Sequence, residues 1–147
     1  MERNNPAVDW PRVWRNIGWK QLSSAQRTLL YLFVNGKHEH RKLLFTMQRA
    51  ADENCTHCAQ TETLLHKFCN CTRVSPAWTV LQQRLAGIMD GWRIQTFGDL
   101  AIPALTGIQK ERQVKILKIF ANYINFLNSC NDVVDVAALN FHLDIGL

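Results

Sequence analysis

Four of the five cysteines in this chain lie within seventeen residues, in the stretch CTHCAQTETLLHKFCNC at 55–71. Cys55 and Cys58 have the C-x2-C spacing, in which one turn can supply two thiolate ligands to a single metal ion. His66 follows eight residues after Cys58 and can supply a third ligand. A set of three cysteines and one histidine favours zinc, so we expect a zinc site in this stretch.

The fourth ligand is either Cys69 or Cys71, and the residues alone leave this choice open. On a continuous α-helix, positions 66 and 69 lie about 60° apart, whereas positions 66 and 71 lie about 140° apart. Helical geometry therefore favours Cys69, and Cys71 can face the metal only if the helix ends first. Asn70 is a residue at which such an ending is tolerated. His57, inside the C-x2-C turn, is a weaker candidate that we expect to point outward.

A site with four side-chain ligands has no open coordination position, so we expect the zinc to be structural. A catalytic zinc needs a bound water and a nearby acid or base, and Glu62 is the only carboxylate between the ligands. The deaminase pattern H-x-E followed by P-C-x-x-C is absent. We therefore expect neither enzymatic activity nor a small-molecule substrate.

One set of residues resembles the zinc-binding region that follows the reverse transcriptase domain in non-LTR (LINE-type) retrotransposons, and the expected downstream helices resemble those at the C-terminal ends of insect elements. The set consists of Cys55, Cys58, Glu62, Thr63, His66, Phe68, Cys71 and Trp78. The resemblance covers about residues 10–90, and it implies that Cys71 is the fourth ligand and Cys69 an extra thiol. The Asp-Asp pair of a reverse transcriptase and an endonuclease carboxylate cluster are absent, so no catalytic activity is implied. Whether the chain is a truncated element, a relic or a recruited host gene stays open.

The net charge of +5 is distributed unevenly along the chain. Residues 10–50 hold eight lysines and arginines against one acid, Glu39, whereas residues 131–147 hold three aspartates and no lysine or arginine. A basic segment of this kind is typical of a surface that contacts RNA or DNA, although the same bases can also be solvated outer faces of helices. The candidate nucleic-acid contacts are Arg12, Arg15, Lys20, Lys37, Arg41, Lys42 and Arg49.

Three tryptophans, Trp10, Trp14 and Trp19, lie among the first of these bases. Interleaved tryptophan and arginine can stack on bases and pair with phosphates of a single strand. Trp10 and Trp14 are one helical turn apart, however, and this spacing favours packing in the core.

The elements that position these residues are predicted to be helical nearly throughout, because no segment shows sustained alternation of period two. Ser23 and Gln26 form a capping box for a helix that ends at Asn35-Gly36. Further helices are expected at about 40–51, from the Ser75-Pro76 cap to about 88, at 108–129 and at 133–143. The predicted inward residues of the 40–51 helix are Leu43, Leu44 and Met47, and those of the next are Trp78, Leu81, Leu85 and Ile88.

We therefore expect a mostly α, small helical domain that is cross-linked by a Cys3His zinc staple. A short β-hairpin at the first two cysteines is compatible with this fold. A flexible segment at 1–9 precedes a single domain at 10–147, with the zinc-binding region at about 50–80 and C-terminal helices at about 108–145. Neither a membrane span nor a signal peptide is predicted. We expect the protein in a reducing compartment, the nucleus or cytoplasm. There, five cysteines are more typical of metal ligands and free thiols than of a set of disulfide bonds.

The sequence is compatible with two functions. The first is a non-catalytic, zinc-binding domain that contacts RNA or DNA through its basic N-terminal third. The second is a zinc-stabilised protein-interaction or scaffolding module, which would use the apolar stripe between Ile108 and Leu127 to bind a partner helix. A relic without its own function is the remaining alternative.

Overall fold

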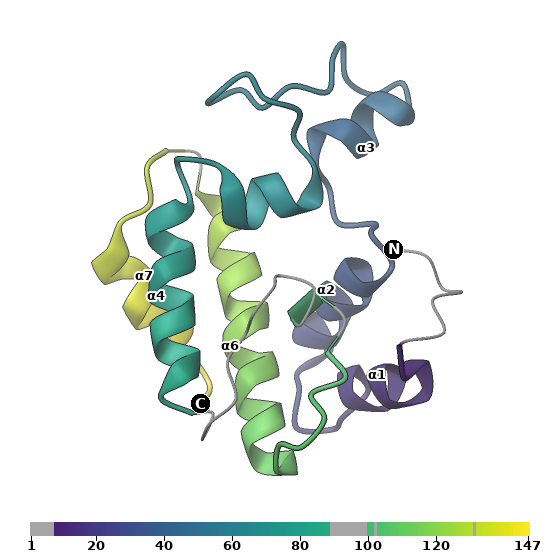
Figure 1. Ribbon diagram of the computed structural model, residues 1–147, viewed down its shortest axis with the longest axis vertical. Helices are drawn as coiled ribbons and strands as arrows, with labels where there is room; N and C mark the ends of the chain where they lie inside the picture. Colours follow the sequence, from purple (N-terminus) through teal and green to yellow (C-terminus); the bar gives the residue numbers. More distant parts are fainter. Residues whose placement is uncertain (1–7, 89–99, 102, 131) are drawn as a thin grey trace.

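The computed structural model describes residues 8–88, 100–101, 103–130 and 132–147 (Figure 1). Residues 1–7 of the segment expected to be flexible lie outside the described residues. The named helices are α1 Trp10–Ile17, α2 Ser24–Val34, α3 Arg41–Thr46, η1 His66–Asn70, α4 Ser75–Ala86, α6 Lys110–Ser129 and α7 Val136–Leu143. The predicted mostly α fold is confirmed. Among these residues, β-structure is limited to one isolated antiparallel bridge between Asn54 and Thr61.

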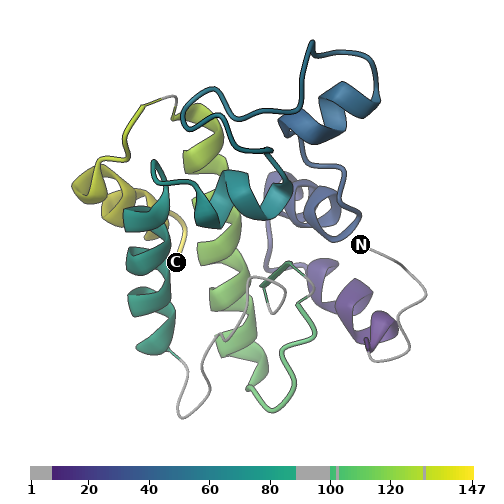
Figure 2. The same ribbon diagram turned by 45° about the horizontal axis from the view of Figure 1, so that its top comes forward.

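The central element of the fold is α6, which contacts α1, α2, α4 and α7. In two views, α4 and α7 lie on one side of α6, and α1 and α2 lie on the other (Figures 1 and 2). The predicted apolar stripe of α6 is buried in the core of the chain itself. Its buried members are Val114, Ile116, Leu117, Ile119, Phe120, Tyr123, Ile124 and Leu127. This helix is therefore the surface on which the other helices bury their own apolar faces.

Aromatic rings join α2, η1 and α6 beside the predicted zinc ligands. The ring of Phe33 lies 5.0 Å from that of Phe68 and 5.3 Å from that of Phe120, both edge to face. His38, just after α2, packs its ring 5.3 Å from Phe33 and 5.1 Å from Phe68. Aromatic pairs of this kind contribute about 0.5–1.5 kcal/mol each beyond their buried area. The segment that carries His66 is therefore held to the core through Phe68.

Both predicted ends of the second helix are confirmed. The Ser23 hydroxyl accepts a hydrogen bond of 3.1 Å from the backbone N–H of Gln26, and the Gln26 side chain accepts one of 2.9 Å from the backbone N–H of Ser23. At the other end, Gly36 takes a left-handed φ of 63°, and the N–H of Lys37 donates to the carbonyl of Leu32 at 2.8 Å. These are the bonds of a capping box and of a Schellman motif.

The prediction for residues 40–51 is wrong in length and in burial. The helix α3 stops well short of this range, and none of its residues is buried. Leu43 and Leu44 are only half-buried, and Met47 is 53% exposed. Figure 1 shows the reason, because α3 projects away from the bundle formed by the other helices.

The early end of α3 has a backbone cause. Gln48 takes a left-handed φ of 58°, and the N–H of Arg49 donates to the carbonyl of Leu44 at 2.8 Å. This is the same Schellman motif that ends α2, but with glutamine in the position that glycine usually takes. Because glutamine rarely adopts this conformation, the sequence does not indicate the stop.

The helix α4 begins one residue earlier than predicted, at the predicted cap residue itself. Val74 is the residue before the helix, and Ser75 is its first residue, with its hydroxyl donating to the carbonyl of Thr72 at 3.3 Å. Two of the predicted inward residues, Trp78 and Ile88, are only half-buried. The buried face of the helix consists of Ala77, Val80, Leu81 and Leu85.

The last predicted helix is present as α7. The carboxylate of Asp135 caps it by accepting hydrogen bonds of 2.9 and 3.2 Å from the backbone N–H groups of Ala137 and Ala138. Leu139 and Leu143 are buried, whereas Phe141 is 77% exposed. The cap therefore places the start of α7 three residues after the expected position 133.

Candidate metal centre

Cys55, Cys58, His66 and Cys71 come together, with their donor atoms all within 4.8 Å of one another. The Sγ atom of Cys71 lies 3.9 Å from that of Cys55 and 4.0 Å from that of Cys58. The Sγ atom of Cys58 lies 3.2 Å from Nε2 of His66. A tetrahedron with zinc–sulfur bonds of about 2.3 Å has sulfur–sulfur edges of about 3.8 Å. The four donors therefore have the spacing of a four-coordinate metal site.

Burial couples the charge of this cluster to the presence of a cation. Cys55, His66 and Cys71 are at most 6% exposed. Burial raises the pKa of the Cys71 thiol to about 11, whereas the backbone N–H of Gln60 lowers the pKa of the Cys58 thiol. Metal binding requires the thiolate forms, and buried thiolates close to one another require a compensating positive charge. A divalent cation would supply that charge.

Cys55 and Cys58 lie in a tight turn closed by backbone hydrogen bonds. Cys55 donates its N–H to the carbonyl of Gln60 at 2.6 Å and accepts from the N–H of Ala59 at 2.9 Å. The backbone N–H of His57 points at the Sγ atom of Cys55 at 3.4 Å. The imidazole of His57 is exposed and lies outside the four-donor group. Of the predicted hairpin, the described residues contain only the single bridge that flanks this turn.

The pair Glu62-Thr63 positions two helices at the cluster. The hydroxyl of Thr63 accepts a hydrogen bond of 3.1 Å from the backbone N–H of His66, and its carbonyl accepts one of 2.9 Å from the N–H of Lys67. Thr63 is thus the N-cap of the turn that carries His66. The carboxylate of Glu62 accepts a hydrogen bond of 2.8 Å from the backbone N–H of Arg41, the first residue of α3. Arg41 and Glu62 are 21 residues apart, so the linear sequence does not indicate the role of Glu62.

The choice between Cys69 and Cys71 follows from the shape of this turn. Residues His66–Asn70 form a π-helix, and the N–H of Cys71 donates to the carbonyl of His66 at 2.9 Å. Since a π-helical bond joins residues five apart, it brings Cys71 onto the same side as His66, which a regular α-helix does not. Cys69 lies outside the four-donor group, packed against the core, and burial raises the pKa of its thiol to about 11. The arrangement supports Cys71 over Cys69.

A polar pocket of about 280 Å³ adjoins the cluster on the side of Cys55. Two of the cations that line it already bind backbone carbonyls. Lys67 donates to the carbonyl of Glu39 at 2.6 Å, and Arg73 donates to that of Cys130 at 2.6 Å. Because Glu39 and Glu62 also line this pocket, its positive charge is partly balanced.

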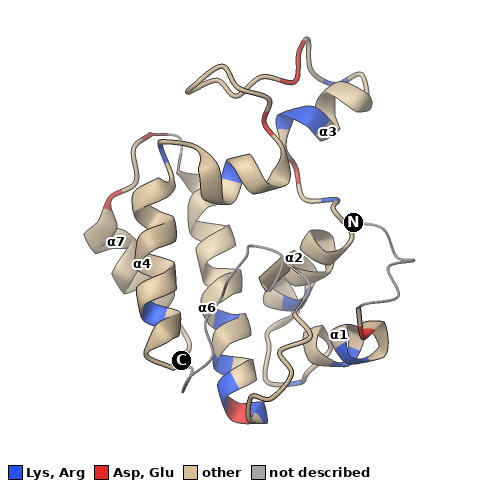
Figure 3. Ribbon diagram, viewed as in Figure 1, with Lys and Arg blue, Asp and Glu red and all other residues tan. Residues whose placement is uncertain are grey.

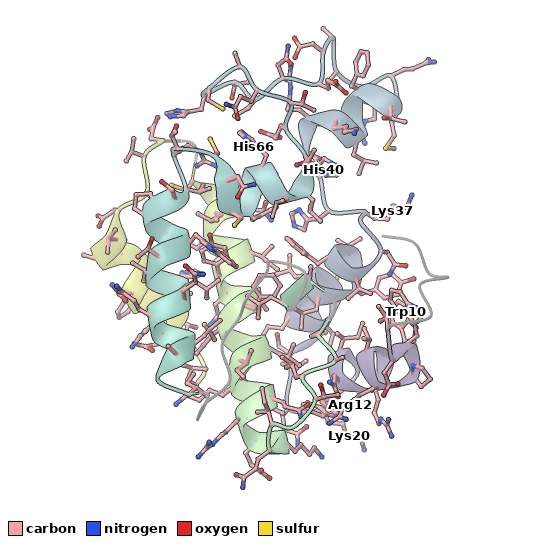
Figure 4. All side chains as sticks on the ribbon, in the orientation of Figure 1. Trp10, Arg12, Lys20, Lys37, His40 and His66 are labelled. Atoms are coloured by element: carbon pink, nitrogen blue, oxygen red, sulfur yellow. The ribbon has the colours of Figure 1, made fainter. Side chains whose placement is uncertain are left out.

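The structure divides the seven candidate nucleic-acid contacts between separate places (Figures 3 and 4). The α1 group lies on α1 and in the turn after it, and consists of Arg12, Arg15 and Lys20. The α3 group lies on α3 and just after it, and consists of Arg41, Lys42 and Arg49. Lys37 follows α2, between these groups in sequence. The bases of the N-terminal third therefore lie on three separate elements of the fold.

The three early tryptophans also separate. The rings of Trp10 and Trp14 stack with their centroids 6.0 Å apart, and both residues pack against the core, as their spacing predicts. Trp19 lies beyond the end of α1, where the ammonium of Lys110 stands 5.6 Å from the centroid of its ring.

Comparisons with protein-family models, with curated proteins and with solved structures found no match for this chain. The resemblance to the retrotransposon zinc-binding region therefore rests on the residues of the motif alone. Across the described residues, no helix has both the length and the apolar character needed to cross a membrane.

Proposed function

We propose that this protein is a non-catalytic, zinc-binding domain that associates with nucleic acid inside the cell, in the nucleus or cytoplasm. The observation that carries the proposal is the cluster of four donor atoms within 4.8 Å of one another. A set of three cysteines and one histidine matches the ligand preference of zinc. With four side-chain ligands, the zinc supplies a structural cross-link and no open catalytic position.

The residues around the cluster support a role in presenting α3. The ligands join the turn at Cys55 and Cys58 to the helical turn at His66, and Glu62 binds the first N–H of α3 from the same place. The bases of the α3 group are thus attached close to the four-donor cluster, on a segment that lies outside the main bundle. Phosphate contacts by such bases give affinity without base recognition.

The motif resemblance supports the same function, because the similar region in retrotransposon polyproteins accompanies an enzyme that works on RNA and DNA. This chain lacks the Asp-Asp pair of that enzyme. The proposal is therefore limited to binding.

Nucleic-acid binding by the zinc-loaded protein tests the proposal. We expect RNA and DNA oligonucleotides to bind at low ionic strength, with a slope of log K against log salt of about −2 or steeper, because the α3 group alone can supply about three phosphate contacts on a single strand. The Lys42→Gln/Arg49→Gln variant should bind more weakly than a matched Arg27→Gln/Lys115→Gln variant, which removes the same charge elsewhere. Absence of salt-sensitive binding by the wild-type protein at about 50 mM salt would contradict the proposal.

A second candidate, a protein-interaction module, is supported by a different surface from the one expected. The apolar stripe of α6 is buried inside the chain, which leaves it no free face for a partner helix. Near the C-terminus, in contrast, large apolar side chains are exposed, namely Val133, Val136, Phe141, Ile145 and Leu147. Light scattering tests this candidate, since self-association that the Phe141→Ser variant abolishes would favour it.

A further inference from the structure

A groove of about 520 Å³ lies between α1 and the start of α6, and none of the four donor residues lines it. Its volume falls in the range of about 300–1,000 Å³ that is typical of ligand-binding clefts. Arg12, Arg15 and Lys110 line it together with Trp19, and no carboxylate is among its described lining residues. The sequence places Lys110 more than ninety residues after Arg15, so folding alone creates this cluster of three cations.

Hydrogen bonds from a buried side chain of α1 fix the two sides of this groove relative to each other. The side chain of Asn16, which is buried, donates hydrogen bonds of 2.8 and 3.2 Å to the carbonyls of Pro103 and Ala104. These bonds tie α1 to the segment that leads into α6. The nearby carboxylate of Asp9 accepts from the backbone N–H of Arg12 at 3.1 Å, as the cap of α1. This bond uses the backbone of Arg12, and the described residues that line the groove include no carboxylate.

An acceptor without a partner completes the lining. Gln113 is only 4% exposed, and its side-chain nitrogen donates to the carbonyl of Ile108, which fixes the orientation of the amide. Its Oε1 atom is buried and has no hydrogen-bond partner among the described residues. A buried acceptor left unpaired is costly, and a ligand N–H or O–H group would satisfy it.

We propose that this groove binds a short stretch of single-stranded nucleic acid, with phosphates on Arg12, Arg15 and Lys110 and one base stacked on Trp19. Trp19 is half-buried, so one part of its indole is held by the core while the rest is accessible. The ammonium of Lys110 stands over this ring, from where it can turn to a phosphate when a base takes its place. The unpaired Gln113 oxygen accepts from a base N–H or a ribose hydroxyl.

The occupant is a single strand because stacking requires an unpaired base. Bases of a duplex are stacked on one another and do not offer a free face to an indole, whereas a flexible strand does. The inference rests on the proposed association with nucleic acid, and it adds where the strand lies and which form is preferred.

Binding of single-stranded RNA, single-stranded DNA and a duplex to the zinc-loaded full chain tests the inference. We expect both single strands to bind more tightly than the duplex. The Arg12→Gln/Arg15→Gln variant should bind more weakly, with a salt slope shallower by about 1.4 for two lost phosphate contacts. Arg27→Gln/Lys115→Gln is the matched control, because it removes two positive charges outside the groove, and its slope should change by less than half as much.

Two substitutions at Trp19 separate stacking from packing. Trp19→Phe keeps an aromatic face and should bind nearly as well as the wild-type protein, whereas Trp19→Leu keeps apolar packing but should bind about tenfold more weakly. Two results would refute binding in the groove: equal affinities of the two Trp19 variants, or equal salt slopes of the Arg12→Gln/Arg15→Gln variant and its control. Either result would leave association with nucleic acid at the α3 group intact. Failure of the wild-type protein to bind any of the three probes would refute the proposed function as well.

Discussion

The hydroxyl of Tyr123, in the middle of α6, donates a hydrogen bond of 2.5 Å to the carbonyl oxygen of Phe68. Phe68 lies in the π-helical turn between His66 and Cys71, so this bond joins the central helix of the core to the segment that carries two of the proposed zinc ligands. Tyr123 is fully buried, and burial raises the pKa of its hydroxyl. The hydroxyl therefore remains a donor at all physiological pH values.

Replacing Tyr123 by Phe should lower the free energy of unfolding by about 1–3 kcal/mol, because the buried carbonyl of Phe68 loses its donor. The same variant should release metal faster to a chelator, since the turn that carries His66 is held less firmly. Tyr31→Phe is the matched control, because Tyr31 is 50% exposed. Equal unfolding free energies for the two variants would show that the bond contributes nothing.

Replacing Cys71 by Ala should abolish stoichiometric zinc binding, whereas Cys69→Ala should retain one zinc per chain. The physical reason is that the π-helical bond between residues 66 and 71 brings Cys71, not Cys69, into the four-donor group. Metal analysis after gel filtration measures the difference. Loss of zinc from the Cys69 variant alone would reverse the assignment.

Replacing Thr63 by Ala should destabilise the protein by about 1 kcal/mol, because the turn that carries His66 loses its N-cap. Thr63→Ser keeps the hydroxyl and should restore most of the stability. Thr61→Ala serves as the control, because Thr61 lies two residues earlier and is exposed. Thermal unfolding of the zinc-loaded proteins measures all three, and a Ser variant as unstable as the Ala variant would contradict the capping role.

His38 should stay neutral in the folded protein at pH 5.5. The pKa of His38 is lowered from 6.5 to about 4, mainly because the ring is buried between aromatic side chains and secondly because Lys67 places a positive charge nearby. Because the folded-state pKa is below the unfolded one, the stability contributed by the neutral ring is complete above about pH 6.5. It is lost as the pH falls towards 4. Nitrogen-15 NMR of the imidazole reports the protonation directly, and a charged ring at pH 6 in the folded protein would contradict this prediction.

The helices that could be predicted from the sequence are those whose ends and faces have distinct residue types. The capping box at Ser23 and Gln26 and the glycine at 36 mark α2, and the dense apolar stripe marks α6. Three of the four donors could be recognised from spacing alone, and the motif resemblance implied the fourth, Cys71. Helical geometry by itself favoured Cys69, because a five-residue separation on an α-helix points Cys71 away from His66, whereas the π-helical turn does not.

Other features depend on contacts between distant residues, which the linear pattern does not contain. Gln48 ends α3 in a left-handed conformation that is unusual for glutamine. The bases of the N-terminal third look like one surface in sequence, but the fold separates the α1 group from the α3 group. The groove at Trp19 includes Lys110 and Gln113 from α6, so it exists only once α1 packs on that helix.

X-ray absorption at the zinc edge of the protein, purified without chelators, tests the central claim most directly. One zinc per chain held by Cys55, Cys58, His66 and Cys71 predicts three sulfur neighbours at about 2.3 Å and one nitrogen neighbour at about 2.0–2.1 Å. Absence of stoichiometric zinc, a shell of four sulfurs, or a shell that contains oxygen would contradict the proposed metal centre.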